Sequence, residues 1–173
     1  MLFKKFLPTY YLNDLKKLEP NDLIKKGFNT ILCDLDNTIV PFSFKTPSNS
    51  AIELIKKMQD AGINFYIISN NHYDRVALFC KNLNIKYLYS SGKPKTKKVN
   101  NFIIDQSIER NKTIIIGDQL LTDIFMANNL KMQSLLVEPA CNKDLLQTKP
   151  NRFVDKRIRN YFKKKNLLKS IKE

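Results

Sequence analysis

The chain has 173 residues, which is enough for one domain with a core and too short for two, and its share of hydrophobic residues, 43%, is ordinary for a globular protein. No apolar stretch approaches the roughly 18 residues of a membrane-spanning helix, and the three cysteines form no Cys-x-x-Cys pair, so we expect a cytoplasmic protein with reduced thiols. The formal net charge of +14 favours an anionic partner, although the excess is mainly lysine and also fits a compositional bias.

Residues 1–26 form an N-terminal segment that we predict to be helical and packed on the rest of the domain. After Pro8, the leucines Leu12, Leu15 and Leu18 follow one another with near-helical spacing among several lysines. The same pattern also fits a basic amphipathic segment that rests on a membrane surface.

The next predicted element is a strand at residues 31–33, an apolar run that ends in Asp34, Asp36 and Thr38. An apolar run of this length predicts a parallel strand buried on both faces. Alternate residues of an extended chain share a direction, so Asp34 and Asp36 begin on the same side, and two carboxylates this close resist joint ionisation unless a cation or a proton lies between them. Asp34 can attack phosphorus while Asp36 transfers protons, although in a bland alternative these residues only cap turns.

A helix is predicted after this loop, from Thr46 and Pro47 to Gly62. Thr46 offers a capping hydroxyl and Pro47 suits the first helical position. The expected buried stripe of this helix consists of Ala51, Ile52, Ile55 and Met58.

The pattern of an apolar run followed by polar residues recurs further along the chain. The predicted strands are 63–68, 86–89, 113–116 and 133–137, which complete a sheet of five. The polar residues that follow the first three of these strands are Ser69, Asn70, Lys93, Asp118 and Asp123. In an open parallel sheet the ligand site lies beyond the carboxyl ends of the strands, so we expect these side chains to line one crevice with Asp34.

Lys93 differs by position from the other lysines around it, which we expect to form a solvated face. It follows Gly92 at a strand end and precedes Pro94, which biases Lys93 to an extended conformation. Its ammonium can neutralise both the Asp34 carboxylate and an incoming phosphate.

Asp118 and Asp123 follow the strand at 113–116 and are candidate metal ligands. Hard oxygen ligands of this kind suit Mg²⁺, which prefers carboxylates, water and phosphate oxygens. For Asp123 two roles stay open: metal binding, directly or through a water, or a favourable charge at a helix N-terminus.

A strongly basic tail at residues 151–173 ends the chain. We predict a terminal helix whose apolar face lies on the domain while its cations point outward.

Four segments, in this order, resemble the motifs of the haloacid dehalogenase (HAD) superfamily, and specifically its subfamily IIIA of small phosphatases, which includes the YqeG-like proteins and the phosphatidylglycerophosphatases. The segments are Asp34-Leu35-Asp36-Asn37-Thr38, Ser69-Asn70, Lys93-Pro94 and Gly117-Asp118-Gln119-Leu120-Leu121-Thr122-Asp123. Further similarity to the YqeG-like group lies at Phe6-Leu7-Pro8, Pro41 and Asn151-Arg152, so the resemblance covers nearly the whole chain.

The resemblance implies a three-layer Rossmann-like α/β fold, with a parallel five-stranded sheet and helices on both faces, over a catalytic core at residues 27–150. It also implies that Mg²⁺ is held by the side chains of Asp34 and Asp118 and by the main-chain carbonyl of Asp36, with Asp123 as a further candidate. The implied reaction is a two-step hydrolysis of a phosphomonoester through an aspartyl-phosphate on Asp34. The residues expected to bind the phosphoryl group or orient the loop are Thr38, Ser69, Asn70 and Lys93.

Related phosphatases often carry a cap domain, and neither loop in which it would be inserted is long enough here. By resemblance, this implies an open site suited to a phosphate on something large or surface-bound. The favoured substrate is a phospholipid headgroup phosphate such as that of phosphatidylglycerophosphate, met at an anionic membrane surface by a peripherally bound protein. The alternatives are a phosphate on protein or nucleic acid, or a nucleic-acid or ribosome-associated binding module that keeps the acidic site.

Overall fold

The computed structural model describes residues 3–141 and 149–173. Six strands form one parallel sheet in the order β1-β6-β5-β2-β3-β4. The strands are β1 (Tyr10–Leu12), β2 (Thr30–Cys33), β3 (Asn64–Ile68), β4 (Lys86–Leu88), β5 (Thr113–Gly117) and β6 (Gln133–Val137). The α-helices are α1 (Pro20–Ile24), α2 (Asn49–Asp60), α3 (Tyr73–Cys80), α4 (Lys97–Asp105), α5 (Phe125–Asn129) and α6 (Lys149–Lys164). The short helical segments are η1 (Lys4–Phe6), η2 (Leu15–Lys17), η3 (Arg110–Lys112) and the π-helical η4 (Leu120–Ile124).

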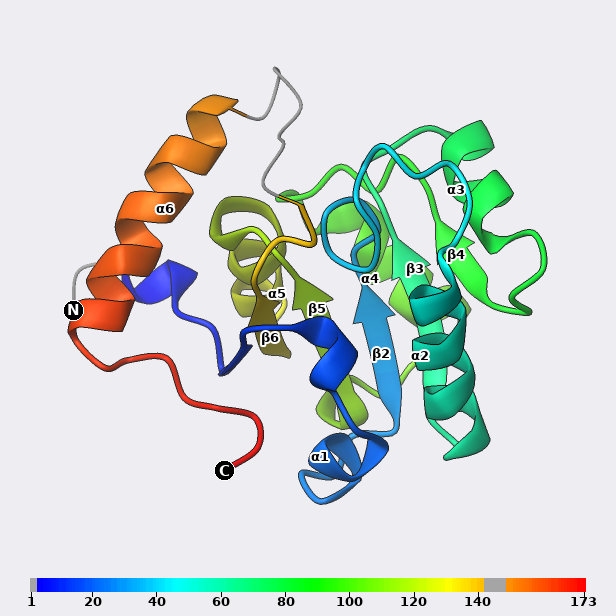
Figure 1. Cartoon of the computed structure of the whole chain (residues 1–173), viewed down its shortest axis with the longest axis horizontal. Coiled ribbons are helices and arrows are strands. Elements are labelled where there is room, and N and C mark those ends of the chain that lie inside the picture. The colour runs from blue at the N-terminus through cyan, green and yellow to red at the C-terminus, as the bar shows by residue number, and fades with distance from the viewer. Residues whose placement is uncertain (1–2, 142–148) are drawn as a thin grey trace.

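Strand β2 lies in the middle of the sheet, between β3 and β5 (Figure 1). Its residues alternate between the two faces, as an extended chain requires. Ile31 and Cys33 pack into the cluster formed with α1, α2 and α3, whereas Leu32 packs into the cluster formed with α4 and α5. The three-layer α/β fold predicted from the sequence is therefore confirmed.

The predicted count of five strands is wrong by one, because the N-terminal segment contributes a strand. Tyr10–Leu12 pairs in parallel with β6, in the register Tyr10 to Leu135 and Leu12 to Val137. The near-helical spacing of the leucines arises from the end of this strand and the 3₁₀ turn η2 that follows it. All three leucines of that pattern, Leu12, Leu15 and Leu18, are buried.

Helix α2 begins later than the sequence indicated. Its N-cap is Ser48, whose Oγ accepts a hydrogen bond from the backbone N–H of Ala51 at 3.3 Å. The buried residues of α2 are Ala51, Leu54, Ile55 and Met58, which have the i, i+3, i+4, i+7 spacing of one helix face. Ile52 lies off this face and is 39% exposed, so its expected burial is wrong.

Helix α6 lies beyond the β6 side of the sheet (Figure 1) and spans the expected boundary at residue 150. Ile158 and Phe162 on its buried face pack against Leu120, Ile124 and Leu136. Within residues 3–141 and 149–173, no helix combines the length and the apolar character that crossing a membrane requires.

Candidate active site

The predicted site residues lie at the carboxyl edge of the sheet, where the loops after β2, β3, β4 and β5 meet. Asp34 directly follows β2, and its N–H donates to the carbonyl of Ile116 in β5 at 2.8 Å, which places it beside Asp118. Ser69 follows β3, and its N–H donates to the carbonyl of Leu88 in β4 at 2.9 Å. The backbone hydrogen bonds between the parallel strands therefore fix the positions of these residues, independently of any contact between their side chains.

Three carboxylates form a buried cluster at this edge. Asp34, Asp118 and Asp123 each offer one oxygen, and these oxygens all lie within 4.8 Å of one another. The three residues are 7%, 0% and 1% exposed. Like charges this close and this dry repel strongly, so the cluster requires cations or protons.

Lys93 supplies one of these cations from the loop after β4. Its Nζ lies 2.6 Å from Asp34 Oδ1 and 2.7 Å from Asp123 Oδ1, and it donates to the carbonyl of Ile68 at 3.0 Å. Burial alone would lower the pKa of Lys93, but Asp123 and Asp34 outweigh it and raise that pKa above its usual value. The ammonium therefore stays charged at neutral pH.

Asn70 holds the loop that carries Lys93. Its Oδ1 accepts hydrogen bonds from the Lys93 N–H at 2.8 Å and from the Ser91 hydroxyl at 2.7 Å, while its Nδ2 donates to the Lys93 carbonyl at 2.9 Å. Asn70 is thus engaged with this loop. Ser69 is buried, and its Oγ accepts a bond from the Asn71 N–H at 3.1 Å, which leaves its own hydrogen to be donated.

Thr38 lies between two of the carboxylates. Its Oγ1 is 3.0 Å from Asp34 Oδ2 and 3.1 Å from Asp118 Oδ1, yet a hydroxyl has only one hydrogen to donate. Burial, followed by the charges of Asp123 and Asp118, raises the pKa of Asp34 to about 7 against the opposing effect of Lys93. Burial likewise raises the pKa of Asp118 to about 6, against the opposing effect of Arg152. Without a further cation, the cluster therefore tends to hold protons.

The donor set of this cluster fits a divalent cation. Oδ2 of Asp118 and Oδ1 of Asp123 are buried without a hydrogen bond from the described residues. Each of them has a cation at ion-pair distance, since Arg152 Nη2 lies 2.5 Å from Asp118 Oδ2 and Lys93 Nζ lies 2.7 Å from Asp123 Oδ1. Carboxylate oxygens left in this state are what Mg²⁺ prefers to bind.

Asp123 reaches the cluster because of a local irregularity. It belongs to the π-helical η4, and its Oδ2 accepts from the Gln119 N–H at 3.2 Å while its Oδ1 faces Lys93. The carboxylate therefore satisfies an N-terminal N–H of this segment and also belongs to the cluster, so the two roles considered for it do not exclude each other. The backbone of Gly117 passes so close that a Cβ there would lie 2.4 Å from the Cβ of Asp123.

Asp36 stands apart from the three clustered carboxylates. Its carboxylate is held by Arg75 Nη2 at 2.8 Å on Oδ1 and by Asn71 Nδ2 at 3.1 Å on Oδ2. Sequence reasoning did not identify Arg75 or Asn71. Arg75 lies in the first turns of a helix, where a lone arginine has the pattern of a surface residue.

Helix α6 supplies a second group of residues that the sequence analysis missed. Arg159 Nη2 donates to the main-chain carbonyl of Asp118 at 2.7 Å and Nη1 to that of Val137 at 3.2 Å, while Asp155 Oδ1 accepts from the Leu120 N–H at 2.5 Å. The pair is also in contact, with Arg159 Nη2 3.4 Å from Asp155 Oδ2. A carboxylate and a guanidinium four residues apart, beside apolar Ile158, are the signal that could have revealed it. The side chain of Asn151 lies outside the described residues.

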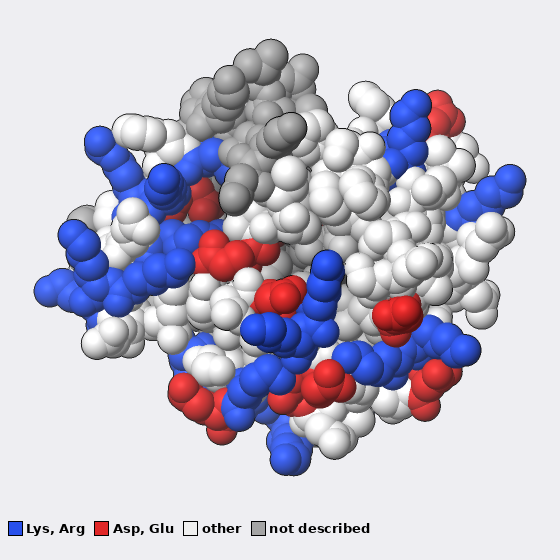
Figure 2. Space-filling model, in the orientation of Figure 1, with Lys and Arg blue, Asp and Glu red and all other residues white. Residues whose placement is uncertain are grey.

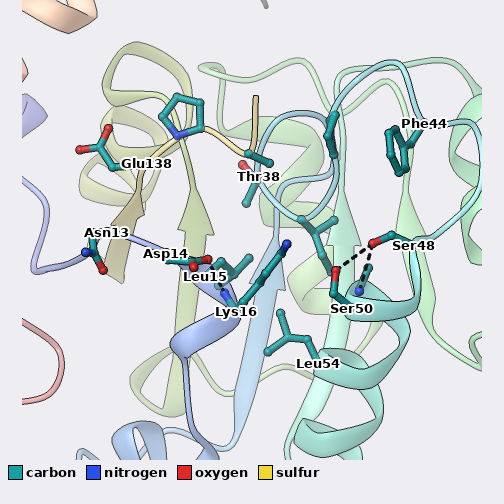
Figure 3. Close-up of a pocket in the computed structure, with 15 residues that line it drawn as sticks. Asn13, Asp14, Leu15, Lys16, Thr38, Phe44, Ser48, Ser50, Leu54 and Glu138 are labelled. Carbon is teal, nitrogen blue, oxygen red and sulfur yellow. Dashed lines mark hydrogen bonds between the residues drawn. The ribbon is translucent and has the colours of Figure 1, made fainter. Parts of the chain in front are cut away.

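A cavity of about 440 Å³ adjoins the loop that follows β2. Thr38 lies on its rim, and the lining includes apolar Leu15 and Leu54 as well as polar Ser48 (Figure 3). Figure 3 shows the Lys16 side chain pointing into this space from η2. The cavity therefore offers both apolar and polar contacts next to a residue that touches Asp34 and Asp118.

Comparison with known proteins agrees with this geometry. The sequence model of the haloacid dehalogenase-like hydrolases matches residues 43–137. A protein of Bacillus subtilis, named "Probable phosphatase YqeG", is 34% identical over 165 residues, which are 95% of this chain and 96% of that protein.

Two solved structures share the fold. The cobalt-bound form of the deoxy-D-mannose-octulosonate 8-phosphate phosphatase YrbI from Haemophilus influenzae has a TM-score of 0.51 and 14% identity, and the match covers 66% of this chain and 80% of that one. An uncharacterized protein from Listeria monocytogenes serotype 4b has a TM-score of 0.53 and 14% identity, with 69% and 86% of the chains covered.

Proposed function

Because the chain belongs to the family of haloacid dehalogenase-like hydrolases, we propose that it is a phosphatase that hydrolyses phosphomonoesters through an aspartyl-phosphate on Asp34. One observation carries this proposal: the Lys93 ammonium lies 2.6 Å from Asp34 Oδ1 inside a buried cluster of three carboxylates. The name of the Bacillus subtilis relative, which describes a phosphatase, supports the same reaction.

The proposal includes Mg²⁺ as the cofactor. Asp34 and Asp118 would hold it, with Asp123 as the third carboxylate of the cluster. When bound, a divalent cation reduces the repulsion between the anionic nucleophile and the phosphate and stabilises the charge on the transferring oxygens. The expected main-chain ligand, the carbonyl of Asp36, belongs to the same proposal.

In the first step, an Asp34 carboxylate oxygen forms a bond to phosphorus while the bond between phosphorus and the leaving oxygen breaks. The protonated Asp36 carboxyl gives its proton to the departing alkoxide. In the second step, Asp36 takes a proton from a water molecule whose oxygen attacks phosphorus, which releases inorganic phosphate and restores the Asp34 carboxylate. Arg75 and Asn71 hold the Asp36 side chain in place for both transfers.

Hydrogen-bond donors and one cation complete the phosphate site in this proposal. The Ser69 hydroxyl has one hydrogen for an equatorial phosphate oxygen, whereas the Thr38 hydroxyl, which lies within hydrogen-bond distance of Asp34 and Asp118, orients the loop. The Lys93 ammonium already faces Asp34 and neutralises charge there as the phosphoryl group moves. Asn70 serves by keeping Lys93 in this position.

For the substrate we propose a phospholipid headgroup phosphate, met by a protein that binds peripherally to an anionic membrane. Figure 2 shows lysine and arginine side chains gathered over α6, and exposed Phe153 and Val154 lie among them beside Lys156 and Arg157. Apolar side chains among cations are typical of surfaces that rest on anionic lipid. The short loops after β2 and β4, which hold no cap domain, support the same proposal.

A phosphatase screen with Mg²⁺ tests this function. The substrates are lipid phosphates in vesicles, sugar phosphates, nucleotides and phosphopeptides, and the Asp34→Asn variant is the matched control. We expect turnover that is fastest with a lipid phosphate and that EDTA abolishes. The Asp34→Asn variant should show no turnover, although its circular dichroism spectrum should match that of the wild-type protein. Phosphate release by purified Asp34→Asn at the wild-type rate would contradict the proposed nucleophile.

A further inference from the structure

A second cavity, of about 500 Å³, lies between α6 and the segment that follows β6. Four cationic side chains of α6 line it: Arg152, Lys156, Arg159 and Lys163. Residues three or four positions apart lie on one face of a helix, and at 1.5 Å per residue this row is about 16 Å long. We call this cavity the cationic groove. It shares Glu138 and Pro139 with the cavity beside Thr38, so both adjoin the same loop.

Two of these four cations already bind other groups of the protein. Arg159 is 6% exposed and bonds to the carbonyls of Asp118 and Val137. Lys163 Nζ lies 2.8 Å from Glu138 Oε1. Because these two cations already have their partners, they shape the groove and do not need a ligand.

The other two cations are differently placed. Lys156 is exposed and lines the groove, and in the described part of the chain its ammonium forms no ion pair or hydrogen bond. Arg152 reaches the acidic cluster, where its Nη2 lies 2.5 Å from Asp118 Oδ2. Arg152 therefore lines the groove and also contacts Asp118 of the proposed phosphoryl-transfer site, so the groove adjoins that site.

Arginine has a planar fork of donors that matches the oxygens of a phosphate, and lysine binds phosphate as a point charge. The Asp118 oxygen that Arg152 contacts is also one of those left for a divalent cation. A divalent cation on that oxygen would compete with the Arg152 guanidinium for it, and the guanidinium also lines the groove.

We propose that the cationic groove binds a second phosphate group of the same substrate molecule, with Arg152 and Lys156 as its binding residues. This inference rests on the proposed function, because it assumes that the first phosphate reacts at Asp34. It narrows the substrate class to phosphomonoesters that carry another phosphate group, as an ester or a diester, within reach of α6.

Calorimetric titration of the Asp34→Asn variant with excess Mg²⁺ tests this inference without turnover. The probes are propyl phosphate and the bisphosphates of 1,3-propanediol, 1,4-butanediol and 1,6-hexanediol. We expect at least one bisphosphate to bind about tenfold more tightly than propyl phosphate, as one added charge-assisted contact allows. Propyl phosphate mixed with free inorganic phosphate should not reproduce this gain, because the gain depends on the covalent link.

Two variants in the Asp34→Asn background locate the second phosphate. Lys156→Gln should remove most of the gain while leaving the affinity for propyl phosphate unchanged. Lys164→Gln removes the same charge from an exposed position of the same helix outside the groove lining, and it should keep the gain. Circular dichroism spectra that match those of the parent show that both variants are folded.

Equal losses in the two lysine variants, or bisphosphates that bind no more tightly than propyl phosphate, would overturn the groove as a second phosphate site. A gain from added inorganic phosphate would overturn the requirement for one molecule. If wild-type protein hydrolyses propyl phosphate and shows no preference for any bisphosphate, this inference fails and the proposed function stands. If it neither binds nor hydrolyses any of these probes, both fail.

Discussion

Replacement of Gly117 with alanine is expected to push Asp123 out of the acidic cluster. A Cβ on Gly117 would lie 2.4 Å from both the Cβ and the Cγ of Asp123 and 2.6 Å from its Oδ2. Carbon atoms that are not bonded need about 3.5 Å, so Asp123 has to move by roughly 1 Å. A rotamer change cannot relieve the contact, because the Cβ of Asp123 is fixed by the η4 backbone, whose Asp123 N–H bonds to the Gln119 carbonyl at 3.0 Å.

The expected cost follows from two losses. Overpacking of a tight site costs about 1–3 kcal/mol. The movement also takes Asp123 away from the buried Lys93 ammonium, now 2.7 Å away, and removal of one partner from a buried ion pair costs about 3–5 kcal/mol when no other partner remains. Because Asp34 stays beside Lys93, we expect Gly117→Ala to lower the free energy of unfolding by about 3 kcal/mol in total.

Urea denaturation in EDTA, followed by circular dichroism, measures this cost in three backgrounds. With wild-type Asp123 the cost should be the full amount. The Asp123→Ala variant keeps the Cβ that would collide with the new Cβ of residue 117. In that background Gly117→Ala should therefore still lower the free energy of unfolding by about 1–3 kcal/mol, the usual cost of overpacking. Asp123→Gly removes the Cβ, and there the cost should fall below about 1 kcal/mol. Equal costs in the alanine and glycine backgrounds, or no cost in wild-type protein, would refute the steric argument.

Two further predictions concern proton transfer and ionisation. Arg75→Gln removes the ion pair that holds Oδ1 of Asp36, so kcat should fall about 10–100-fold in steady-state kinetics. KM, and the Mg²⁺ affinity measured by titration, should stay nearly unchanged. A change in KM alone would show that Arg75 binds substrate instead. The pKa values of Asp34 and Asp118, raised from 3.8 to about 7 and about 6, mean that the folded chain keeps protons that the unfolded chain loses. In EDTA the free energy of unfolding should therefore fall as pH rises from about 4 to 7, by at most about 1.4 kcal/mol per pH unit for each proton, and Asp34→Asn should flatten part of this slope. Thermal melts across this range that show no difference in slope between wild-type and variant protein would contradict the assignment.

The sheet was largely predictable because its central strands are buried on both faces. Such strands are nearly continuous apolar runs that end where polar residues begin, so β3, β5 and β6 were located to within about a residue. Strand β1 was missed, since three residues are too few to show a period of two. Its partner, β6, is also more than a hundred residues away in the sequence.

The contacts of Asp34, Lys93 and Asp118 could be anticipated for a related reason. Residues that follow parallel strands meet at one edge whatever the helices between them do. Arg75 and Arg152 could not be found in this way, because each lies in a helix among other polar residues. Their partners, Asp36 and Asp118, become neighbours only when that helix docks on the sheet.

The central claim is that Asp34 accepts a phosphoryl group, and an acid-quenched single turnover with excess enzyme and Mg²⁺ tests it most directly. p-Nitrophenyl phosphate serves as the substrate, and mass spectrometry of the digested protein locates any added group. We predict one added phosphoryl group on the peptide that contains Asp34, absent from the Asp34→Asn variant and from samples quenched after phosphate release is complete. Turnover without any phosphorylated peptide, or with the group on another residue, would contradict the account.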